Sequence, residues 1–194
     1  MSKARMTIED DINKAVEVLK RGGVILYPTD TVWGLGCDAT NAAAVERIYE
    51  IKRRADSKAL ILLLGDVADL HRYVDEVPDI ALELIGVSVR PTTIIYDRAI
   101  NVAANVTAED GSVAIRVTAD AFCRQLCRRL RRPLVSTSAN ISGEPTAASY
   151  RRINPAIVQA VDYVVEHRRE ENTQSRPSAI IKISSDYSFK IIRK

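Results

Sequence analysis

The sequence has few of the residues that build metal centres or disulfide frameworks. Its 194 residues include only three cysteines and two histidines, which are too few and too scattered for a convincing zinc site or a set of disulfides. Cys123 and Cys127 are spaced i, i+4 on a predicted helix, where a small apolar patch on the packed side explains them. An odd number of cysteines also fits a reducing compartment.

Long apolar runs are missing as well. No stretch approaches the roughly 20 residues of a membrane-spanning helix. The N-terminal segment MSKARMTIEDDINKAV has no apolar core after its basic residues, so we predict no signal peptide. The content of 46% hydrophobic and 27% charged residues is ordinary for a soluble globular protein. We therefore expect a cytoplasmic protein that does not bind membranes.

Aromatic residues make up only 5% of the chain, which argues against recognition of single-stranded nucleic acid by base stacking. Five arginines crowd residues 124–132, with pairs at 151–152 and 168–169, although the formal net charge is only +3. A solvated helix face, with cations favoured near the helix C-terminus, explains the first cluster. A surface for nucleic acid or phosphate is the alternative.

Predicted helices and strands are interspersed along the chain. Apolar spacing and capping residues predict helices between Thr7 and Gly22 and at 41–53, 66–74, 78–87, 119–131 and 149–161. Buried strands are predicted at 24–28, 59–64, 92–97, 112–117, 133–138, 163–167, 178–184 and 187–193. With no long linker and no repeat, this order predicts one α/β domain, residues 1–194, around a twisted and mixed sheet.

A first polar loop, YPTDTVWGLG (27–36), follows the first predicted strand. Ligands of α/β proteins are usually held at strand ends, and threonine hydroxyls beside glycines suit a compact polar ligand. The loop is not a Walker A motif, because it has no GxxxxGK[ST] pattern. A tight turn whose hydroxyls bond the local backbone is the competing interpretation.

A second segment is basic. Lys52, Arg53 and Arg54, followed by Lys58, stand directly before the apolar run ALILLL (59–64). Cations at the end of a helix are usually partners of its dipole. Their position before a buried strand also suits a polyphosphate clamp, in which arginine gives bidentate contacts and lysine a point charge.

A third loop, STSANISG (136–143), places four hydroxyls and a carboxamide within eight residues at the end of a predicted strand. Such groups can bind phosphate oxygens or a ribose without adding charge. An Asx or ST turn accounts equally well for the pattern.

Together and in this order, the three loops resemble the YrdC family of threonylcarbamoyl-AMP synthases. That family shows YPT-[DE]-TV-[YW]-GLG, then KxR with Lys or Asn four residues later, then SxN followed by SG. The matching residues here are YPTDTVWGLG (27–36), Lys52, Arg54, Lys58, Ser138, Asn140, Ser142 and Gly143. The resemblance runs from about residue 8 to 193 and implies a single α/β domain with an open, basic concave surface.

The resemblance also implies an activity. We expect L-threonine, bicarbonate and ATP, with Mg²⁺ on the phosphates, to give threonylcarbamoyl-AMP and pyrophosphate for N6-threonylcarbamoyladenosine at position 37 of tRNA. The partner would be a downstream threonylcarbamoyl transferase complex, with tRNA or double-stranded RNA as a further candidate. A non-catalytic module that binds double-stranded RNA or tRNA, largely by shape and phosphate contacts, is the competing hypothesis, and carbamoyl transfer to another acceptor is a third.

The resemblance assigns roles to individual residues. The expected catalytic residues are Lys52 and Arg54. The expected ATP-binding residues are Arg54, Lys58, Ser136, Ser138, Asn140, Thr146 and Arg193. The expected threonine-binding residues are Thr31, Arg116 and Ser178. No metal-ligating residue is expected.

Three departures from the family pattern stand out. Ala55 and Ala59 replace prolines that the family often carries. Leu63 replaces a histidine that commonly contacts threonine, which puts the amino-acid contacts in doubt. The usual PGPxT segment is represented by 90–93, Arg-Pro-Thr-Thr. None of these changes removes a predicted phosphate-binding cation.

Overall fold

A nine-stranded sheet runs through the part of the chain that the computed structural model describes, residues 6–53, 60–172 and 177–194. The strand order across the sheet is β7-β1-β2-β6-β3-β5-β4-β8-β9. The strands are β1 (Ile25–Tyr27), β2 (Gly34–Gly36), β3 (Ile61–Leu64), β4 (Thr92–Tyr96), β5 (Val113–Val117), β6 (Leu134–Ser138), β7 (Tyr163–Val164), β8 (Ala179–Ile183) and β9 (Phe189–Arg193). Three neighbouring pairs are parallel and five antiparallel, so the predicted mixed sheet is confirmed.

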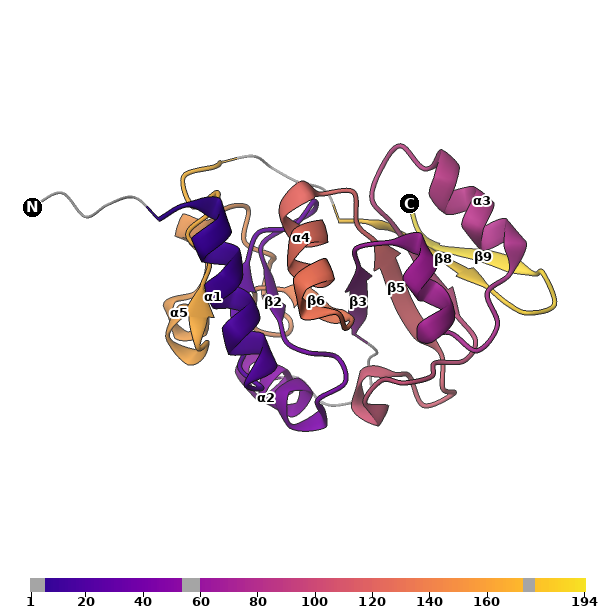
Figure 1. Ribbon diagram of the computed structural model, residues 1–194, viewed down its shortest axis with the longest axis horizontal. Helices are drawn as coiled ribbons and strands as arrows, with labels where there is room; N and C mark the ends of the chain where they lie inside the picture. Colours follow the sequence, from indigo (N-terminus) through magenta and orange to yellow (C-terminus); the bar gives the residue numbers. More distant parts are fainter. Residues whose placement is uncertain (1–5, 54–59, 173–176) are drawn as a thin grey trace, which may run out of the picture.

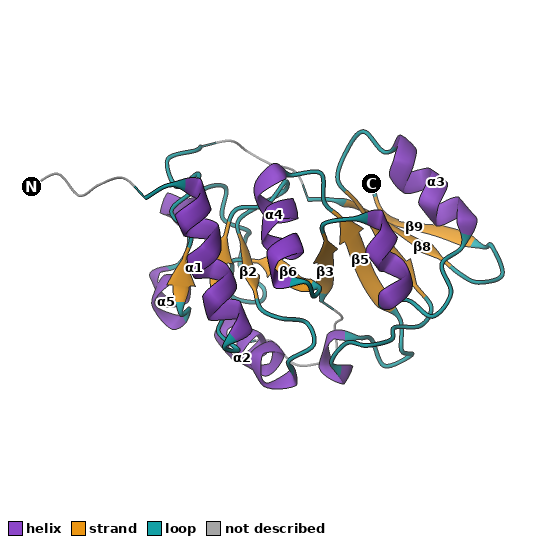
Figure 2. Ribbon diagram, viewed as in Figure 1, coloured by secondary structure: helices purple, strands orange, loops and turns teal. Residues whose placement is uncertain are grey.

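Helices pack on the sheet, and two of them have the capping residues that the sequence predicts. They are α1 (Ile8–Lys20), α2 (Ala42–Lys52), α3 (Asp79–Val87), α4 (Ala121–Leu130) and α5 (Pro155–Ala160), with 3₁₀ turns η1 (Val67–Arg72), η2 (Ala104–Val106) and η3 (Tyr150–Arg152). The side chains of Thr7 and Asn41 accept hydrogen bonds from backbone amides in the first turns of α1 and α2. Helices α1 and α4 lie side by side over one part of the sheet (Figures 1 and 2). No helix of the described residues is long and apolar enough to cross a membrane.

The unbroken leucine run of β3 reflects two separate apolar clusters. Leu62 and Leu64 belong to a large cluster that includes Ile48 of α2. Leu63 belongs to a second cluster with Leu126 of α4. Because side chains alternate along a strand, a strand covered on both faces needs apolar residues at every position. Cys123 and Cys127 are buried in the second cluster, which confirms their packing role.

Strand β2 lies inside a segment that the sequence predicts as a loop. Its three residues, Gly-Leu-Gly, pair with both β1 and β6. A Cβ atom at Gly36 would lie 2.6 Å from the Tyr27 ring and 2.9 Å from the Val135 carbonyl oxygen. The glycine therefore lets β2 pack tightly between its neighbours, although glycine has a low strand propensity.

Two predicted helices differ from the structure. The segment 149–161 forms η3 and then α5, because Asn154 caps a new helix whose first residue is Pro155. The segment 66–74 forms only the 3₁₀ turn η1.

The sheet brings the polar loops to one place. Ile61 at the start of β3 pairs with Ser136 near the end of β6, and Gly34 of β2 pairs with Ser138. The loop between β1 and β2, residues 28–33, therefore reaches the same edge as the third polar loop. Strand β5 lies on the other side of β3 and contributes Arg116.

Candidate active site

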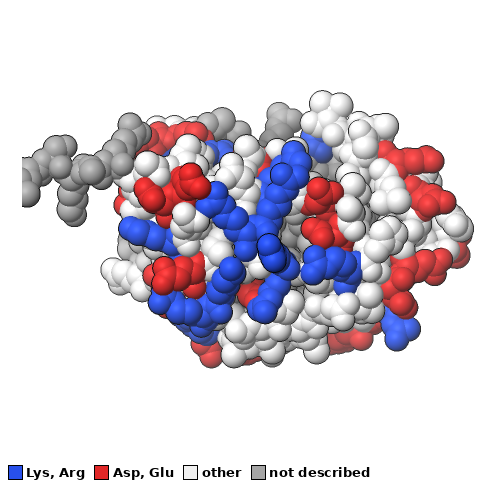
Figure 3. Space-filling view, viewed as in Figure 1, with Lys and Arg blue, Asp and Glu red and all other residues white. Residues whose placement is uncertain are grey.

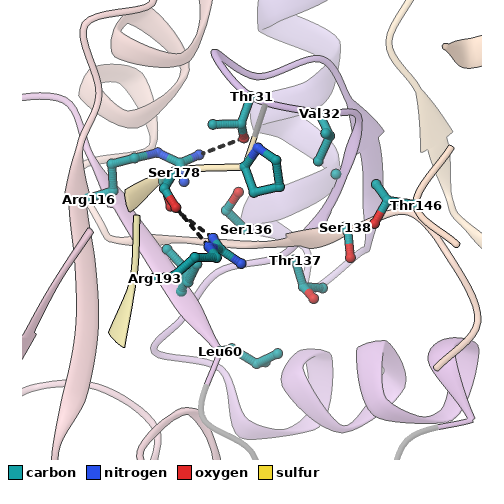
Figure 4. A pocket seen from close by; sticks show the side chains of 13 residues that line it. Thr31, Val32, Leu60, Arg116, Ser136, Thr137, Ser138, Thr146, Ser178 and Arg193 are labelled. Carbon is teal, nitrogen blue, oxygen red and sulfur yellow. Dashed lines mark hydrogen bonds between the residues drawn. The ribbon is translucent and has the colours of Figure 1, made fainter. Parts of the chain in front are cut away.

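A cavity of about 180 Å³ lies where these strands meet (Figure 4). We call it the Arg116 cavity. It is lined by Thr31, Val32, Gly34, Leu60, Ile61, Arg116, Ser136, Thr137, Ser138, Thr146, Pro177, Ser178 and Arg193. The structure thus brings together the three predicted threonine-binding residues and four of the predicted ATP-binding residues.

Arg116 carries a buried charge in the wall of this cavity, with only 3% of the residue exposed. Its Nη2 atom lies 3.0 Å from Asp30 Oδ1 and donates a longer bond, 3.4 Å, to Thr31 Oγ1. Among the described residues its Nε atom is buried and has no hydrogen-bond partner. Leaving a buried donor unpaired costs about 1–3 kcal/mol of stability. An anion that accepts a hydrogen bond from Nε would remove this cost, so the site is suited to bind one.

Thr29 stabilises the loop from residue 28 to 33, and Thr31 of the same loop lines the cavity. Thr29 Oγ1 accepts a bond from the Thr31 amide (3.0 Å) and donates to the Val32 carbonyl (2.7 Å). Thr29 therefore plays the local turn role that competes with a binding role. The Thr31 hydroxyl lies 3.0 Å from the Thr29 hydroxyl and also accepts the longer bond from Arg116 (Figure 4). Thr29 therefore has only the turn role, whereas Thr31 takes part in the turn and also lines the cavity.

Ser178 and Arg193 form another wall. Arg193 Nε donates to the Ser178 carbonyl (2.9 Å) and its Nη2 to Ser178 Oγ (3.3 Å). Burial, and secondly the positive charge of Arg116, lower the pKa of Arg193 below its ordinary value. Arginine stays protonated nonetheless, so two guanidiniums share the cavity and favour a negatively charged ligand.

Thr93 supports this wall without lining the cavity, and it was not singled out by sequence reasoning. Its hydroxyl lies 2.8 Å from the Ser178 hydroxyl, and the residue is fully buried. The signal in the sequence was its place in the 90–93 segment, which matches a family motif. The pairing with a serine 85 residues away becomes visible only when β4 and β8 lie parallel.

Of the third loop, Ser136 and Ser138 line the cavity, but Asn140 is directed into its own turn. Asn140 Nδ2 donates to the carbonyls of Ile141 (3.0 Å) and Glu144 (2.8 Å). Asn140 therefore stabilises the turn through its amide nitrogen, and this is not an Asx turn, because its Oδ1 atom is buried without a hydrogen-bond partner among the described residues. Thr146 follows the turn and closes the cavity (Figure 4).

Lys52 lies beneath this loop rather than in the cavity lining. Its residue is 3% exposed, and Nζ donates to the carbonyl oxygens of Ser138 and Asn140 at 2.5 and 2.8 Å. Lys52 thus ties the end of α2 to the backbone of the third loop. Arg54 and Lys58, with Ala55 and Ala59, lie outside the described residues.

Comparison with known proteins identifies the family. The Sua5/YciO/YrdC family model, described as "Telomere recombination", matches residues 17–194. A protein of Xanthomonas euvesicatoria pv. vesicatoria (strain 85-10), named threonylcarbamoyl-AMP synthase, is 40% identical over 164 residues, 83% of this chain and 88% of its own. The chain belongs to the Sua5/YciO/YrdC family.

Solved structures of this family share the fold. E. coli YciO is 25% identical with a TM-score of 0.82, over 98% of this chain and 91% of its own. P. abyssi Sua5, solved in complex with L-threonine, is 25% identical with a TM-score of 0.80, over 93% of this chain. The match covers 52% of that protein, so the chain spans about half the length of the P. abyssi relative.

Leu63, where the family resemblance led us to expect a histidine, does not line the Arg116 cavity. It is fully buried in the second apolar cluster and lies beside Arg116 in the register of β3 and β5. In this member of the Sua5/YciO/YrdC family, the strand position next to the buried guanidinium is therefore apolar and supplies no hydrogen bond to it.

The arginine cluster near the end of α4 lines a different hollow. Arg128, Arg131 and Arg132 surround a space of about 420 Å³ together with Arg72. Arg132 pairs with Asp38 at 2.6 Å, and Arg72 and Arg128 also pair with carboxylates. Figure 3 shows the basic side chains gathered around α4. This surface is partly neutralised and separate from the Arg116 cavity, whose lining cations are Arg116 and Arg193.

We predict that Lys52→Met lowers the free energy of unfolding by about 1–3 kcal/mol, because two carbonyl oxygens lose a charged donor. Urea denaturation measures this change. Lys20→Met, at the exposed end of α1, is the matched control and should change the free energy by less than about 0.5 kcal/mol. Equal effects of the two substitutions would show that Lys52 does not hold the third loop.

Proposed function

We infer that the chain is a threonylcarbamoyl-AMP synthase, a nucleotidyltransferase that supplies N6-threonylcarbamoyladenosine formation in tRNA. A relative of that name is 40% identical over most of the chain. The observation that carries the inference is the Arg116 cavity, in which a buried cation with an unpaired donor lies beside hydroxyls from three separate polar segments.

The amino acid is proposed to bind at the Arg116 end of the cavity. The carboxylate of L-threonine would accept hydrogen bonds from Arg116, and charge-assisted bonds of this kind are the strong ones. The hydroxyls of Thr31 and Ser178 lie beside it and can bind the polar atoms of threonine. The threonine complex of P. abyssi Sua5 supports this choice of ligand.

ATP is proposed to bind along the serine-rich wall. Ser136, Ser138 and Thr146 offer hydroxyls, and Arg193 offers a charge, while Asn140 and Lys52 shape the loop. Arg54 and Lys58 are proposed to hold the phosphates. The described residues contain no group of three or more His, Cys, Asp or Glu that could hold a metal ion. Mg²⁺ would accordingly be bound by the phosphates of ATP and water, its usual ligands.

The proposed reaction uses a nucleophile that belongs to the substrate. The neutral amine of threonine attacks carbon dioxide and loses a proton, or attacks bicarbonate with loss of water, and in either case forms a carbamate. A carbamate oxygen then attacks the α-phosphorus of ATP, and the bond to the departing pyrophosphate breaks. Catalysis of this kind consists mainly of positioning and charge stabilisation. A cavity that excludes water would also protect the unstable carbamate.

The product is proposed to pass to a threonylcarbamoyl transferase complex. The arginine cluster around α4 is proposed as the surface that binds tRNA or double-stranded RNA, because the phosphate backbone of a nucleic acid binds exposed cations. Contact with RNA would be an addition to the synthase activity.

Pyrophosphate release from ATP tests the proposed function. With purified protein and Mg²⁺, release should require both L-threonine and bicarbonate, because the carbamate forms before the α-phosphorus is attacked. Each substrate is omitted in turn as the control. Release that continues without threonine, or no release with all substrates present, would contradict the function.

Arg54→Ala is expected to reduce adenylate formation by about 100-fold or more, since loss of one charge-stabilising group costs on the order of 3 kcal/mol in such sites. Steady-state kinetics at saturating substrate measure the loss. Arg53→Ala, which changes the neighbouring arginine, is the matched control and should keep most of the activity. Near-normal turnover of the Arg54 variant would refute its assigned role.

Arg116→Ala is expected to raise the KM for threonine by roughly 10- to 100-fold, because a charge-assisted hydrogen bond contributes about 1.5–3 kcal/mol. The KM for ATP should stay within about twofold, since Arg116 is proposed to bind only the amino acid. An unchanged KM for threonine would show that the carboxylate binds elsewhere.

A further inference from the structure

Asp30 has no role in the site as described so far, although it lies between two residues of the 28–33 loop that do. Its Oδ1 atom is 3.0 Å from Arg116 Nη2. Asp30 does not line the Arg116 cavity. It lines a different hollow of about 350 Å³, together with Thr118 and Arg124. Its carboxylate therefore meets the guanidinium as an ion pair from outside the cavity lining, and Oδ1 has no hydrogen-bond partner among the described residues.

The carboxylate is itself held in place. Thr118 Oγ1 donates to Asp30 Oδ2 at 3.2 Å, and the same hydroxyl oxygen accepts a bond from the Asp120 amide at 3.2 Å. Because the hydroxyl oxygen accepts the hydrogen bond from the Asp120 amide, the hydroxyl hydrogen remains free to point to Asp30. Thr118 is 3% exposed, and Asp120 caps α4. The junction of β5 and α4 thus fixes the direction in which Asp30 meets Arg116.

This contact divides the donors of Arg116 into two groups. A guanidinium has five N–H donors in a planar fork. Asp30 and Thr31 both lie against Nη2, whereas Nε is buried without a partner among the described residues. Nη2 is therefore anchored, and the Nε–H is left for a ligand. Because the guanidinium is planar and rigid, fixing Nη2 also restricts the direction of the Nε–H.

Asp30 also balances charge. Arg193 lies close enough for the charge of Arg116 to lower its pKa. Without Asp30, the buried guanidinium of Arg116 would have the positive charge of Arg193 nearby and no carboxylate beside it. A buried charge that loses its partner is strongly destabilised. Arg116 would then gain by turning away from its present position, and Nε would turn with it.

We propose that Asp30 is a positioning residue for amino-acid binding: it anchors Arg116 through Nη2, so that the Nε–H meets the carboxylate of the substrate. This inference rests on the proposed function. It predicts that Asp30 affects the binding of threonine and not the binding of ATP. Thr118 contributes by holding the Asp30 carboxylate in place.

Steady-state kinetics of Asp30→Asn give the first test. The KM for threonine should rise at least tenfold, with the KM for ATP within twofold and kcat reduced less than the KM is raised. Asp30→Glu keeps the carboxylate. The logarithm of its increase in the KM for threonine should be no more than half of that for Asp30→Asn. Asp38→Asn is the matched control, because Asp38 is also buried and paired with an arginine, Arg132, but lies outside the cavity. It should leave the KM for threonine unchanged.

Binding of two ligands separates positioning from a merely structural role. Calorimetry compares L-threonine with L-threoninol, which lacks the carboxylate. The wild-type protein should prefer threonine, and Asp30→Asn should reduce that preference at least fivefold. If Asp30→Asn does not fold, Thr118→Val, which retains both charges, should still reduce the preference at least twofold.

The outcomes distinguish this inference from the proposed function. A wild-type protein that releases no pyrophosphate contradicts the function. An active wild-type protein whose preference for threonine over threoninol is unchanged in the folded Asp30 or Thr118 variants contradicts only the positioning role. Equal loss of affinity for both ligands would mean that Asp30 supports the fold and not the carboxylate contact, and would also overturn the proposal.

Discussion

The buried charge of Arg116 is the constraint around which the site is organised. A guanidinium in the middle of a sheet strand is costly unless charged and polar groups surround it. Asp30 and Thr31 reach it from the β1–β2 loop, and Arg193 stands across the cavity. Among the described residues its Nε is buried and has no hydrogen-bond partner, and an amino-acid carboxylate would supply the missing acceptor. The architecture of nine strands serves to bring these distant segments together around one cation.

Residue chemistry predicted which loops form the site better than it predicted what each side chain does. Thr31, Arg116, Ser178 and Arg193 are spread over most of the chain, yet all line one cavity. Their placement was expected from the family resemblance, because no local pattern links β5 to β8. Lys52 was expected beside the nucleotide, but it also bonds the backbone of the third loop. That contact depends on how α2 meets β6, which spacing along the chain does not encode.

The fold was most predictable where one strong local signal acted alone. Capping residues and apolar periodicity predicted α1 and α2, and the apolar run ALILLL (59–64) predicted a strand covered on both faces. Strand β2 was missed because Gly-Leu-Gly has little strand propensity and is extended only through its two neighbours. The prediction of one helix at 149–161 was wrong because Pro155 begins a new helix. The segment is therefore divided between η3 and α5.

A crystal structure with L-threonine bound would test the account most directly. The account predicts one carboxylate oxygen within hydrogen-bond distance of Arg116 Nε, about 2.7–3.2 Å, while Asp30 stays against Nη2. Threonine bound outside the cavity, or a carboxylate held by other groups with Arg116 Nε still lacking an acceptor, would contradict it.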